Sequence, residues 1–175
     1  MRGGGDPFWH DAARPGLAVS PSPAVAPLVL DAAAVRALLP HAGTMCLLAG
    51  VRAYDHDTIS CVATGHRHPA HPLRARGRLG AACAIEYAAQ AMAVHGALGG
   101  LDGASRGGAL LAVRDLRCAV ARLDDQGPVL AIVCQCRTRA DAGAVYDFQV
   151  SAAGPVLVSG RATVRFGLSA ASGSL

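Results

Sequence analysis

The chain has 175 residues, of which 52% are hydrophobic and 16% are charged, so it can form one domain with a substantial buried core. Its net charge is +4, all sixteen basic side chains are arginine, and only 4% of the residues are aromatic. There is little material for stacking on bases and little charge for bulk nucleic-acid binding. We therefore expect an acidic partner and no nucleic acid.

The six cysteines are scattered through apolar segments and form no framework of closely spaced pairs. This pattern predicts buried free thiols, no metal site and a reducing, cytoplasmic location. The first residues are rich in glycine and include aspartates, so no signal peptide is expected. The apolar stretch at 79–98 could span a bilayer by length, but its central carboxylate and weakly hydrophobic alanines argue against a membrane span.

The N-terminal part contains a leader, a short helix and two strands. Residues 1–26 are rich in glycine and proline and are predicted to form a flexible leader, followed by a folded domain over 27–167. Asp31 is a suitable N-cap for a short helix that ends at Pro40. Strands are predicted over 45–53 and 58–64, joined by a polar turn. A polar, arginine-containing loop follows over 65–78.

The C-terminal part combines one long helix with four strands. The helix is predicted over 79–98 and ends at a glycine pair. Strand patterns follow, separated by turn residues, at 108–120, 129–139, 145–152 and 156–166. Residues 168–175 are predicted to be a disordered tail. An antiparallel sheet wrapped around one central helix satisfies this order and explains a helix that is apolar on every side. The predicted class is therefore α+β.

Glu86 is the only glutamate in the chain, and it lies in the middle of this apolar helix. An ionised, unpaired carboxylate in such surroundings costs several kcal/mol, so we expect a partner or a raised pKa. The alternative is a helix-surface carboxylate that pairs with an arginine. Gln90 follows Glu86 by four residues, so a helix places both side chains on one face. The apolar residues around Glu86 favour a chemical role.

Two motifs resemble those of the beta-hydroxyacyl-ACP dehydratases. The first is Leu38-Leu39-Pro40-His41 followed by Met45-Cys46-Leu47-Leu48, and the second is the helix phrase Ile85-Glu86-Tyr87-Ala88-Ala89-Gln90-Ala91. The closer resemblance is to the dehydratase-like subfamily of aryl-polyene and related pigment gene clusters, through the phrase that runs from Gly77-Arg78-Leu79 to Ala84-Ile85-Glu86. The resemblance implies a hotdog fold, which is normally a dimer that joins two sheets edge to edge.

The resemblance also implies a reaction, the dehydration of a 3-hydroxyacyl-ACP thioester to the trans-2-enoyl-ACP in fatty acid-like or aryl-polyene pigment biosynthesis. The substrate would be carried on the phosphopantetheine of an acyl carrier protein, and no other cofactor is implied. A base must take the C2 proton, an acid must protonate the C3 hydroxyl, and donors must hold the thioester oxygen. Glu86 matches the family carboxylate. Ala81 and Ala82 match the donors at the helix N-terminus, and with Gln90 they are expected to bind the substrate.

The histidine departs from the family pattern, in which it comes from the opposite subunit and lies in a Gly-His-Phe-Pro phrase. His66, His68 and His71 lie in the corresponding loop. His71 precedes a proline and lies fifteen residues before Glu86 (86 − 71), close to the family spacing, so it is the expected base. Alternatively, all three are exposed loop histidines. His41 is then the reserve candidate, with a structural role as its other interpretation.

Arg74, Arg76 and Arg78 lie immediately before the helix, with no acid between them. Such a run is often a solvated surface, but arginine also pairs well with carboxylate and phosphate, so docking of the acidic carrier protein is the functional hypothesis. Two other functions stay open. The chain could be a hotdog thioesterase, or a catalytically silent acyl-binding partner of an active dehydratase subunit. A homodimer and a heterodimer with another hotdog subunit are both compatible with the sequence.

Overall fold

The computed structural model describes residues 27–99, 108–140 and 143–166. The predicted leader at 1–26 and tail at 168–175 lie outside the described residues. Within them the helices are α1 (Ala32–Leu38) and α2 (Ala84–Leu98). The strands are β1 (Leu30–Asp31), β2 (Gly50–Tyr54), β3 (Thr58–Ala63), β4 (Gly108–Cys118), β5 (Leu130–Ala140), β6 (Gly143–Ala152) and β7 (Val156–Phe166).

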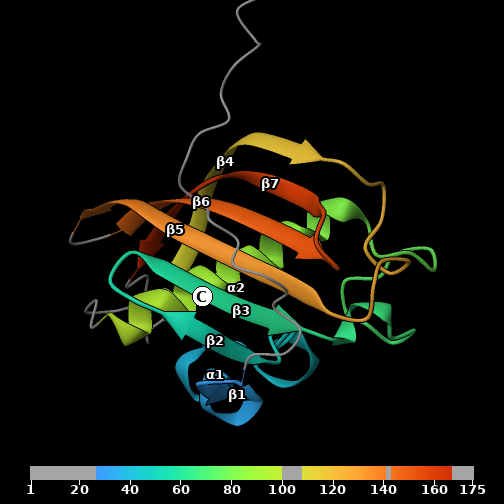
Figure 1. The fold of residues 1–175 in the computed structure, drawn as a ribbon, viewed down its shortest axis with the longest axis horizontal. Coiled ribbons are helices and arrows are strands. Elements are labelled where there is room, and N and C mark those ends of the chain that lie inside the picture. The colour runs from blue at the N-terminus through green and yellow to red at the C-terminus, as the bar shows by residue number, and fades with distance from the viewer. Residues whose placement is uncertain (1–26, 100–107, 141–142, 167–175) are drawn as a thin grey trace, which may run out of the picture.

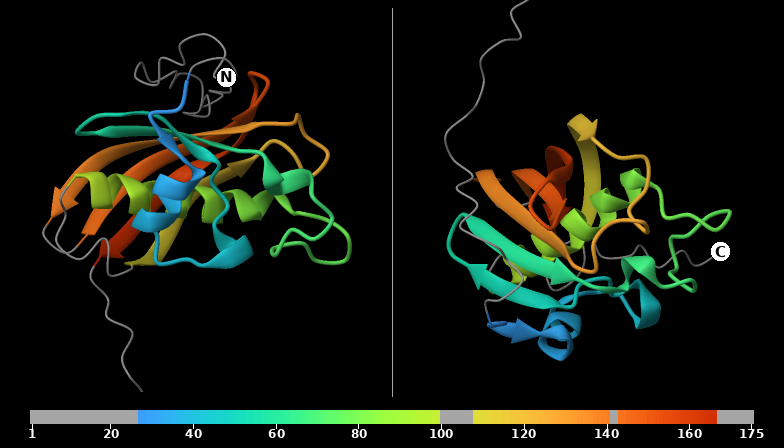
Figure 2. Two further views of the ribbon diagram at one scale, coloured as in Figure 1. Left: turned by 90° about the horizontal axis from the view of Figure 1, so that it is seen from below. Right: turned by 45° about the vertical axis from the view of Figure 1, so that its right-hand side comes forward.

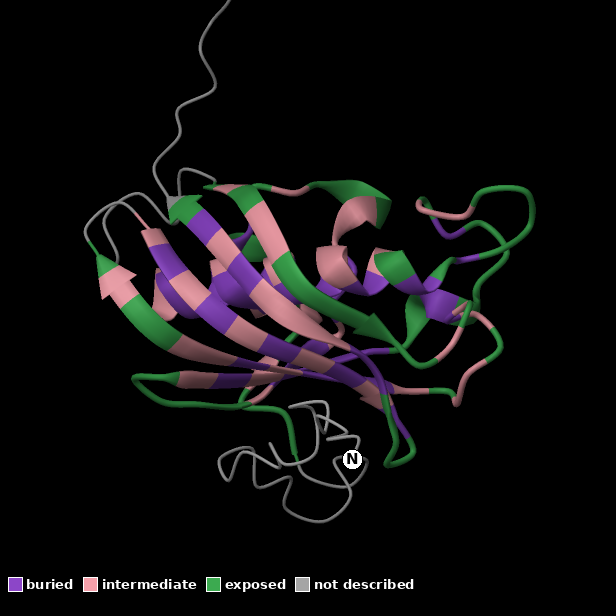
Figure 3. Ribbon diagram, turned by 90° about the horizontal axis from the view of Figure 1, so that it is seen from above, coloured by how far each residue is buried: buried purple, intermediate pink, exposed green. Residues whose placement is uncertain are grey.

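One antiparallel sheet, in the order β1-β2-β3-β5-β6-β7-β4, curves around α2 (Figures 1 and 2). This arrangement confirms the predicted α+β hotdog fold. The alternation of buried and half-buried residues along β6 explains how the sheet covers the helix (Figure 3). Its inward side chains include Tyr146 and Phe148, which are fully buried in the same core as Tyr87 and Met92 of α2. At the edge of the sheet, β4 is mostly exposed.

The long helix begins later than the sequence pattern predicts, at Ala84 instead of Leu79. The preceding residues pair with the segment that follows β4. The Leu123 N–H donates to the Leu79 carbonyl at 2.8 Å, and the Ala81 N–H donates to the Ala121 carbonyl at 3.1 Å. A single turn of 3-10 helix, Ala81–Cys83, then leads into α2. These long-range hydrogen bonds replace those that an earlier helical turn would form.

The strand predicted over 45–53 is shorter in the structure, where β2 covers Gly50–Tyr54 and residues 43–45 form a 3-10 turn. The cause is a side chain of α2. Gln90 Oε1 accepts the Leu47 N–H at 2.9 Å, and Gln90 Nε2 donates to the Met45 carbonyl at 2.7 Å. The backbone at 45–47 therefore turns towards the helix instead of towards a neighbouring strand.

All six cysteines are free. Cys61 and Cys134 are buried in the core as expected, whereas Cys118 is exposed on β4. Within 27–99, 108–140 and 143–166, no helix is long and apolar enough to cross a bilayer.

Candidate active site

Glu86 lies in the first turn of α2, and the structure brings it together with His41, which follows Pro40 at the end of α1. His41 Nε2 lies 3.2 Å from Glu86 Oε1, and each side chain is about one-third exposed, at 31% and 32%. The two groups therefore contact each other and remain accessible. His41 Nδ1 has no hydrogen-bond partner among the described residues, so within them the polar contact of this ring is the one that Nε2 makes with Glu86.

Gln90 holds Glu86 in place from the next turn of the helix. It is fully buried, and its Nε2 donates to Glu86 Oε1 at 3.0 Å as well as to the Met45 carbonyl. Both amide hydrogens of Gln90 are therefore engaged within the chain, and any effect on a substrate passes through Glu86. The hydrogen bond and the His41 contact both reach Oε1 of Glu86, so Oε2 is the oxygen left for chemistry.

A pocket of about 120 Å³ opens beside this pair. Ala89 and Ala93, on successive turns of α2 from Glu86, form one wall, and their methyl groups leave space for a ligand. The other walls come from the ends of two strands, Gly108, Ala109 and Leu110 of β4 and Val164 and Arg165 of β7. Except for the His41–Glu86 pair and Arg165, the lining is apolar, as a pocket for an acyl chain requires.

His71, the base expected from motif spacing, contacts the residue next to Glu86. Its Nε2 lies 2.8 Å from the Tyr87 hydroxyl oxygen, and its Nδ1 accepts the Leu73 N–H at 3.2 Å. Because Nδ1 is an acceptor, the neutral ring carries its proton on Nε2 and donates it to Tyr87. Burial, with the charges of neighbouring basic groups, lowers the pKa of His71. Within this chain both ring nitrogens are occupied, and neither faces Glu86.

Three other histidines make structural contacts with residues other than Glu86. His66 is fully buried, and its Nε2 donates to the Gly127 carbonyl at 2.8 Å. His68 is exposed, and its Nδ1 accepts the Ala70 N–H at 3.1 Å. His95 is buried between the Asp55 carbonyl and the Tyr146 hydroxyl, both at 2.9 Å. His41 is thus the one histidine, among those described, that contacts Glu86.

Ala81 and Ala82, whose backbone N–H groups are the expected hydrogen-bond donors before α2, have different surroundings. The N–H of Ala81 is engaged by the Ala121 carbonyl, whereas Ala82 is exposed. Ala82 is therefore the more accessible of the two for a ligand at this end of the helix. In the described part of the chain, no group of three or more His, Cys, Asp or Glu side chains has the arrangement of a metal site.

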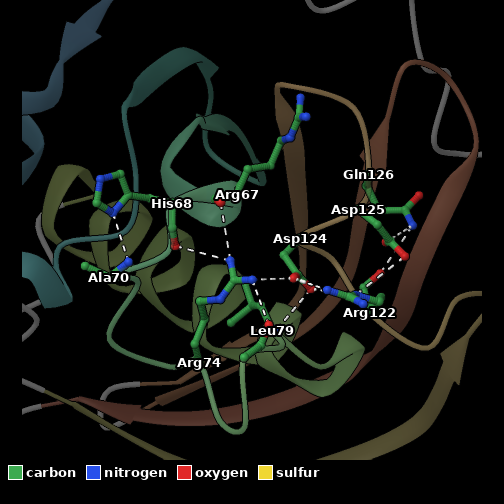
Figure 4. A network of polar contacts seen from close by, with 10 residues as sticks. Arg67, His68, Ala70, Arg74, Leu79, Arg122, Asp124, Asp125 and Gln126 are labelled. Carbon is green, nitrogen blue, oxygen red and sulfur yellow. Dashed lines mark hydrogen bonds and ion pairs between the residues drawn. The ribbon is translucent and has the colours of Figure 1, made fainter.

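The three arginines before α2 fall into two groups. Arg74 is mostly buried, with 17% of its side chain exposed, and its Nη2 lies 2.7 Å from Asp124 Oδ2 (Figure 4). Arg76 and Arg78 are exposed. Asp124 is almost completely buried and also binds Arg122, whose hydrogen bonds hold the pKa of Asp124 well below its usual range. The sequence Asp124-Asp125-Gln126-Gly127-Pro128 indicates a turn. It does not indicate the contact between Asp124 and Arg74, which lies 50 residues earlier in the chain.

A family model described as ApeP-like, ApeP dehydratase, matches residues 33–167. A solved chain of the dehydratase heterocomplex ApeI:P from Xenorhabdus doucetiae is 29% identical, with a TM-score of 0.67, and the match covers 75% of this chain and 90% of that one. No curated protein matches the sequence.

Two more distant structures share the fold alone. The thioesterase superfamily member 2 of zebra fish is 13% identical, with a TM-score of 0.56 over 76% of this chain and 93% of that one. AziG of S. sahachiroi is 12% identical, with a TM-score of 0.51 over 68% of this chain and 90% of that one. The family model, in contrast, spans most of the sequence. The protein therefore belongs to the ApeP-like dehydratase family.

Proposed function

We propose that the protein dehydrates a 3-hydroxyacyl thioester, carried on the phosphopantetheine of an acyl carrier protein, to the trans-2-enoyl thioester in fatty acid-like or aryl-polyene pigment biosynthesis. The observation that carries this proposal is the 3.2 Å contact between His41 and Glu86 at the wall of a largely apolar pocket. Elimination of water requires one group that accepts a proton and one that donates a proton, close together beside the acyl chain. The pocket provides both.

In the proposed reaction, His41 Nε2 takes the proton from C2 of the substrate. The C2–H electron pair forms the C2–C3 double bond, and the C3 hydroxyl leaves as water with the proton of the Glu86 carboxyl. The imidazolium proton then returns from His41 to Glu86 across their contact, so the pair is restored without another reactant. The hydrogen bond from Gln90 Nε2 to Oε1 keeps the Glu86 carboxyl group in position during these steps.

The choice of His41 over His71 rests on the contacts of each ring. His41 contacts Glu86 directly through Nε2, whereas both ring nitrogens of His71 are hydrogen-bonded to other groups. His71 remains the prediction of motif spacing, and the family arrangement, in which the histidine comes from the opposite subunit, leaves room for it. Variants of both histidines distinguish the two roles.

A second hotdog subunit is part of the proposal. The edge strand β4 has exposed Leu110, Leu111 and Leu116, at 39%, 59% and 40%, along a row of unpaired backbone groups. An exposed edge strand presents unpaired backbone groups with which a strand of another chain can pair. The 29% identical chain belongs to a heterocomplex, which supports a partner subunit, identical or different, for this protein.

The test is incubation of the assembled protein with a 3-hydroxyacyl carrier protein, with mass spectrometry to detect the loss of one water. Glu86→Gln keeps the shape but cannot donate the proton, so we expect turnover to fall by about two to four powers of ten. His41→Ala should cause a similar loss and His71→Ala a much smaller one. His68→Ala, a change at an exposed histidine of the same loop, is the matched control.

Each other outcome identifies a different function or base. A large loss with His71→Ala and none with His41→Ala would assign the base to the loop. Release of free acid instead of water would identify a thioesterase. Full turnover of the assembly with both Glu86→Gln and His41→Ala would identify this chain as a silent subunit.

A further inference from the structure

The segment between β3 and α2 contains a two-residue hairpin that presents an arginine at its tip. Ala75 and Arg78 exchange two backbone hydrogen bonds, at 2.9 and 3.0 Å, around Arg76 and Gly77. Arg76 and Gly77 have φ angles of +52° and +73°. Positive φ at both central residues is the requirement of a type I′ turn, which favours Asn-Gly. The first of these positions therefore holds arginine where asparagine would be less strained.

The guanidinium group of Arg74 holds this hairpin in place. Arg74 donates to four oxygens: the carbonyls of Arg67 and His68 at 3.3 Å each, the Gly77 carbonyl at 2.8 Å and Asp124 Oδ2 at 2.7 Å (Figure 4). Arg74 therefore connects the start of the loop and the tip of the hairpin to the segment after β4. A lysine at this position could not reach all four acceptors with one ammonium group.

Asp124 connects the same cluster to the start of α2. Its Oδ1 accepts the Leu79 N–H at 3.0 Å and Arg122 Nε at 2.9 Å, while Oδ2 accepts Arg74. Leu79 lies between the hairpin and the first turn of α2. The Asp124 carboxylate therefore fixes the hairpin and the helix start relative to each other.

Arg74 and Arg122 are paired with Asp124, whereas the three other arginines between β3 and α2 are exposed. They are Arg67, whose side chain points away from the cluster in Figure 4, together with Arg76 and Arg78. The exposed acid beside them is Asp125, which lies 3.6 Å from Arg122 and accepts a hydrogen bond from Gln126. The surface is therefore basic, and its main acid is already occupied.

We infer that the Ala75–Arg78 hairpin is a preformed docking element for the acidic surface of the carrier protein, with Arg76 as its contact residue and Arg74 and Asp124 as its positioning residues. The inference rests on the proposed function, since a carrier protein is the partner that this function requires. The positive φ of Arg76 is a strained backbone conformation at an exposed residue. Such strain is retained where the side chain has a function that compensates for its cost. Arg74, expected from the sequence to contact the carrier, here supports the contact without making it.

Arg76→Asn tests the docking role, because it creates the preferred turn pair and removes the charge. We expect the melting temperature to rise by about 2–4 °C, while the dissociation constant for an acyl carrier protein, measured by calorimetry without turnover, increases about threefold to tenfold at low salt. Arg36→Asn, an equal change on α1, is the control and should leave carrier binding unchanged. Wild-type affinity in Arg76→Asn, or equal weakening by Arg36→Asn, would overturn the docking role.

Asp124→Asn and Arg74→Lys test the positioning role, and the second variant serves if the first does not fold. We expect trypsin to cleave within residues 74–78 at least about tenfold faster than in the wild type, because local opening exposes these bonds, and carrier binding to weaken together with this change. Unchanged cleavage would refute the positioning role. Carrier binding that behaves as expected in a protein without dehydratase turnover would reject the proposed function and leave this inference standing.

Discussion

Gln90→Leu removes three hydrogen bonds that a single buried side chain makes. The buried Leu47 N–H and the partly buried Met45 carbonyl would lose their partner, and Glu86 would lose the donor that holds Oε1. Leaving a buried polar group unpaired costs about 1–3 kcal/mol. Glu86 is 32% exposed and can bind water instead, so the two backbone groups dominate. We expect the free energy of unfolding to fall by about 2–5 kcal/mol, measured by urea denaturation.

Gln90→Glu separates stability from chemistry at the same position. The new carboxyl can still accept the Leu47 N–H, but its second oxygen would face Glu86 Oε1, where Gln90 Nε2 now lies at 3.0 Å. Two carboxyls at this distance resist double ionisation, so the pair titrates with one raised apparent pKa. We expect the acidic limb of the pH profile of kcat/KM to move upward by about 1–2 pH units.

The matched control is Gln90→Met, which removes the amide without adding a charge. It should reduce stability and turnover but leave the acidic limb where it is in the wild type. If Gln90→Glu also leaves the limb unchanged while turnover persists, Glu86 does not titrate in the reaction. The role assigned to Gln90 as the residue that orients Glu86 would then be refuted.

Two further predictions concern acid sensitivity and substrate length. Burial lowers the pKa of His66, His71 and His95, so each binds a proton less readily in the folded chain than in the unfolded one. The free energy of unfolding should therefore be highest above about pH 6.5 and should fall on acidification, by at most about 1.4 kcal/mol per pH unit for each histidine. Urea midpoints that stay constant from pH 7 to 5 would contradict this. Ala93→Phe should fill much of the pocket and lower kcat/KM for long acyl chains more than for short ones, and an equal decrease for all lengths would show that Ala93 does not limit the chain.

The elements of the fold follow from local patterns, which is why the sequence predicts most of them. β6 alternates between buried and half-buried positions, and α2 is apolar around most of its circumference. The differences occur where a distant side chain binds backbone. Gln90 turns residues 45–47 away from the sheet, and neighbouring residues give no signal of a partner 43 positions along the chain.

The candidate site could be predicted only in part, because it too depends on contacts between residues that are far apart in the sequence. Glu86 stands out as a lone acid in an apolar helix, and this follows from composition alone. The choice between His41 and His71 depends on where two loops place their rings. Tyr87 engages His71, while the turn held by Gln90 belongs to the segment that carries His41. The spacing of the motifs gives only distances along the chain, so it indicates neither of these contacts.

The position of the pocket links the proposed chemistry to assembly. Residues 108–110, which form one of its walls, belong to the exposed edge strand β4, and Leu110 contributes both to that wall and to the apolar edge. A subunit that pairs with β4 would therefore lie directly beside the pocket. Glu86, Gln90 and His41 are already in contact within one chain, so the partner is not needed to bring them together. In the proposed reaction, such a subunit would enclose the acyl chain and exclude water, which would strengthen the interactions of the His41–Glu86 pair with the substrate.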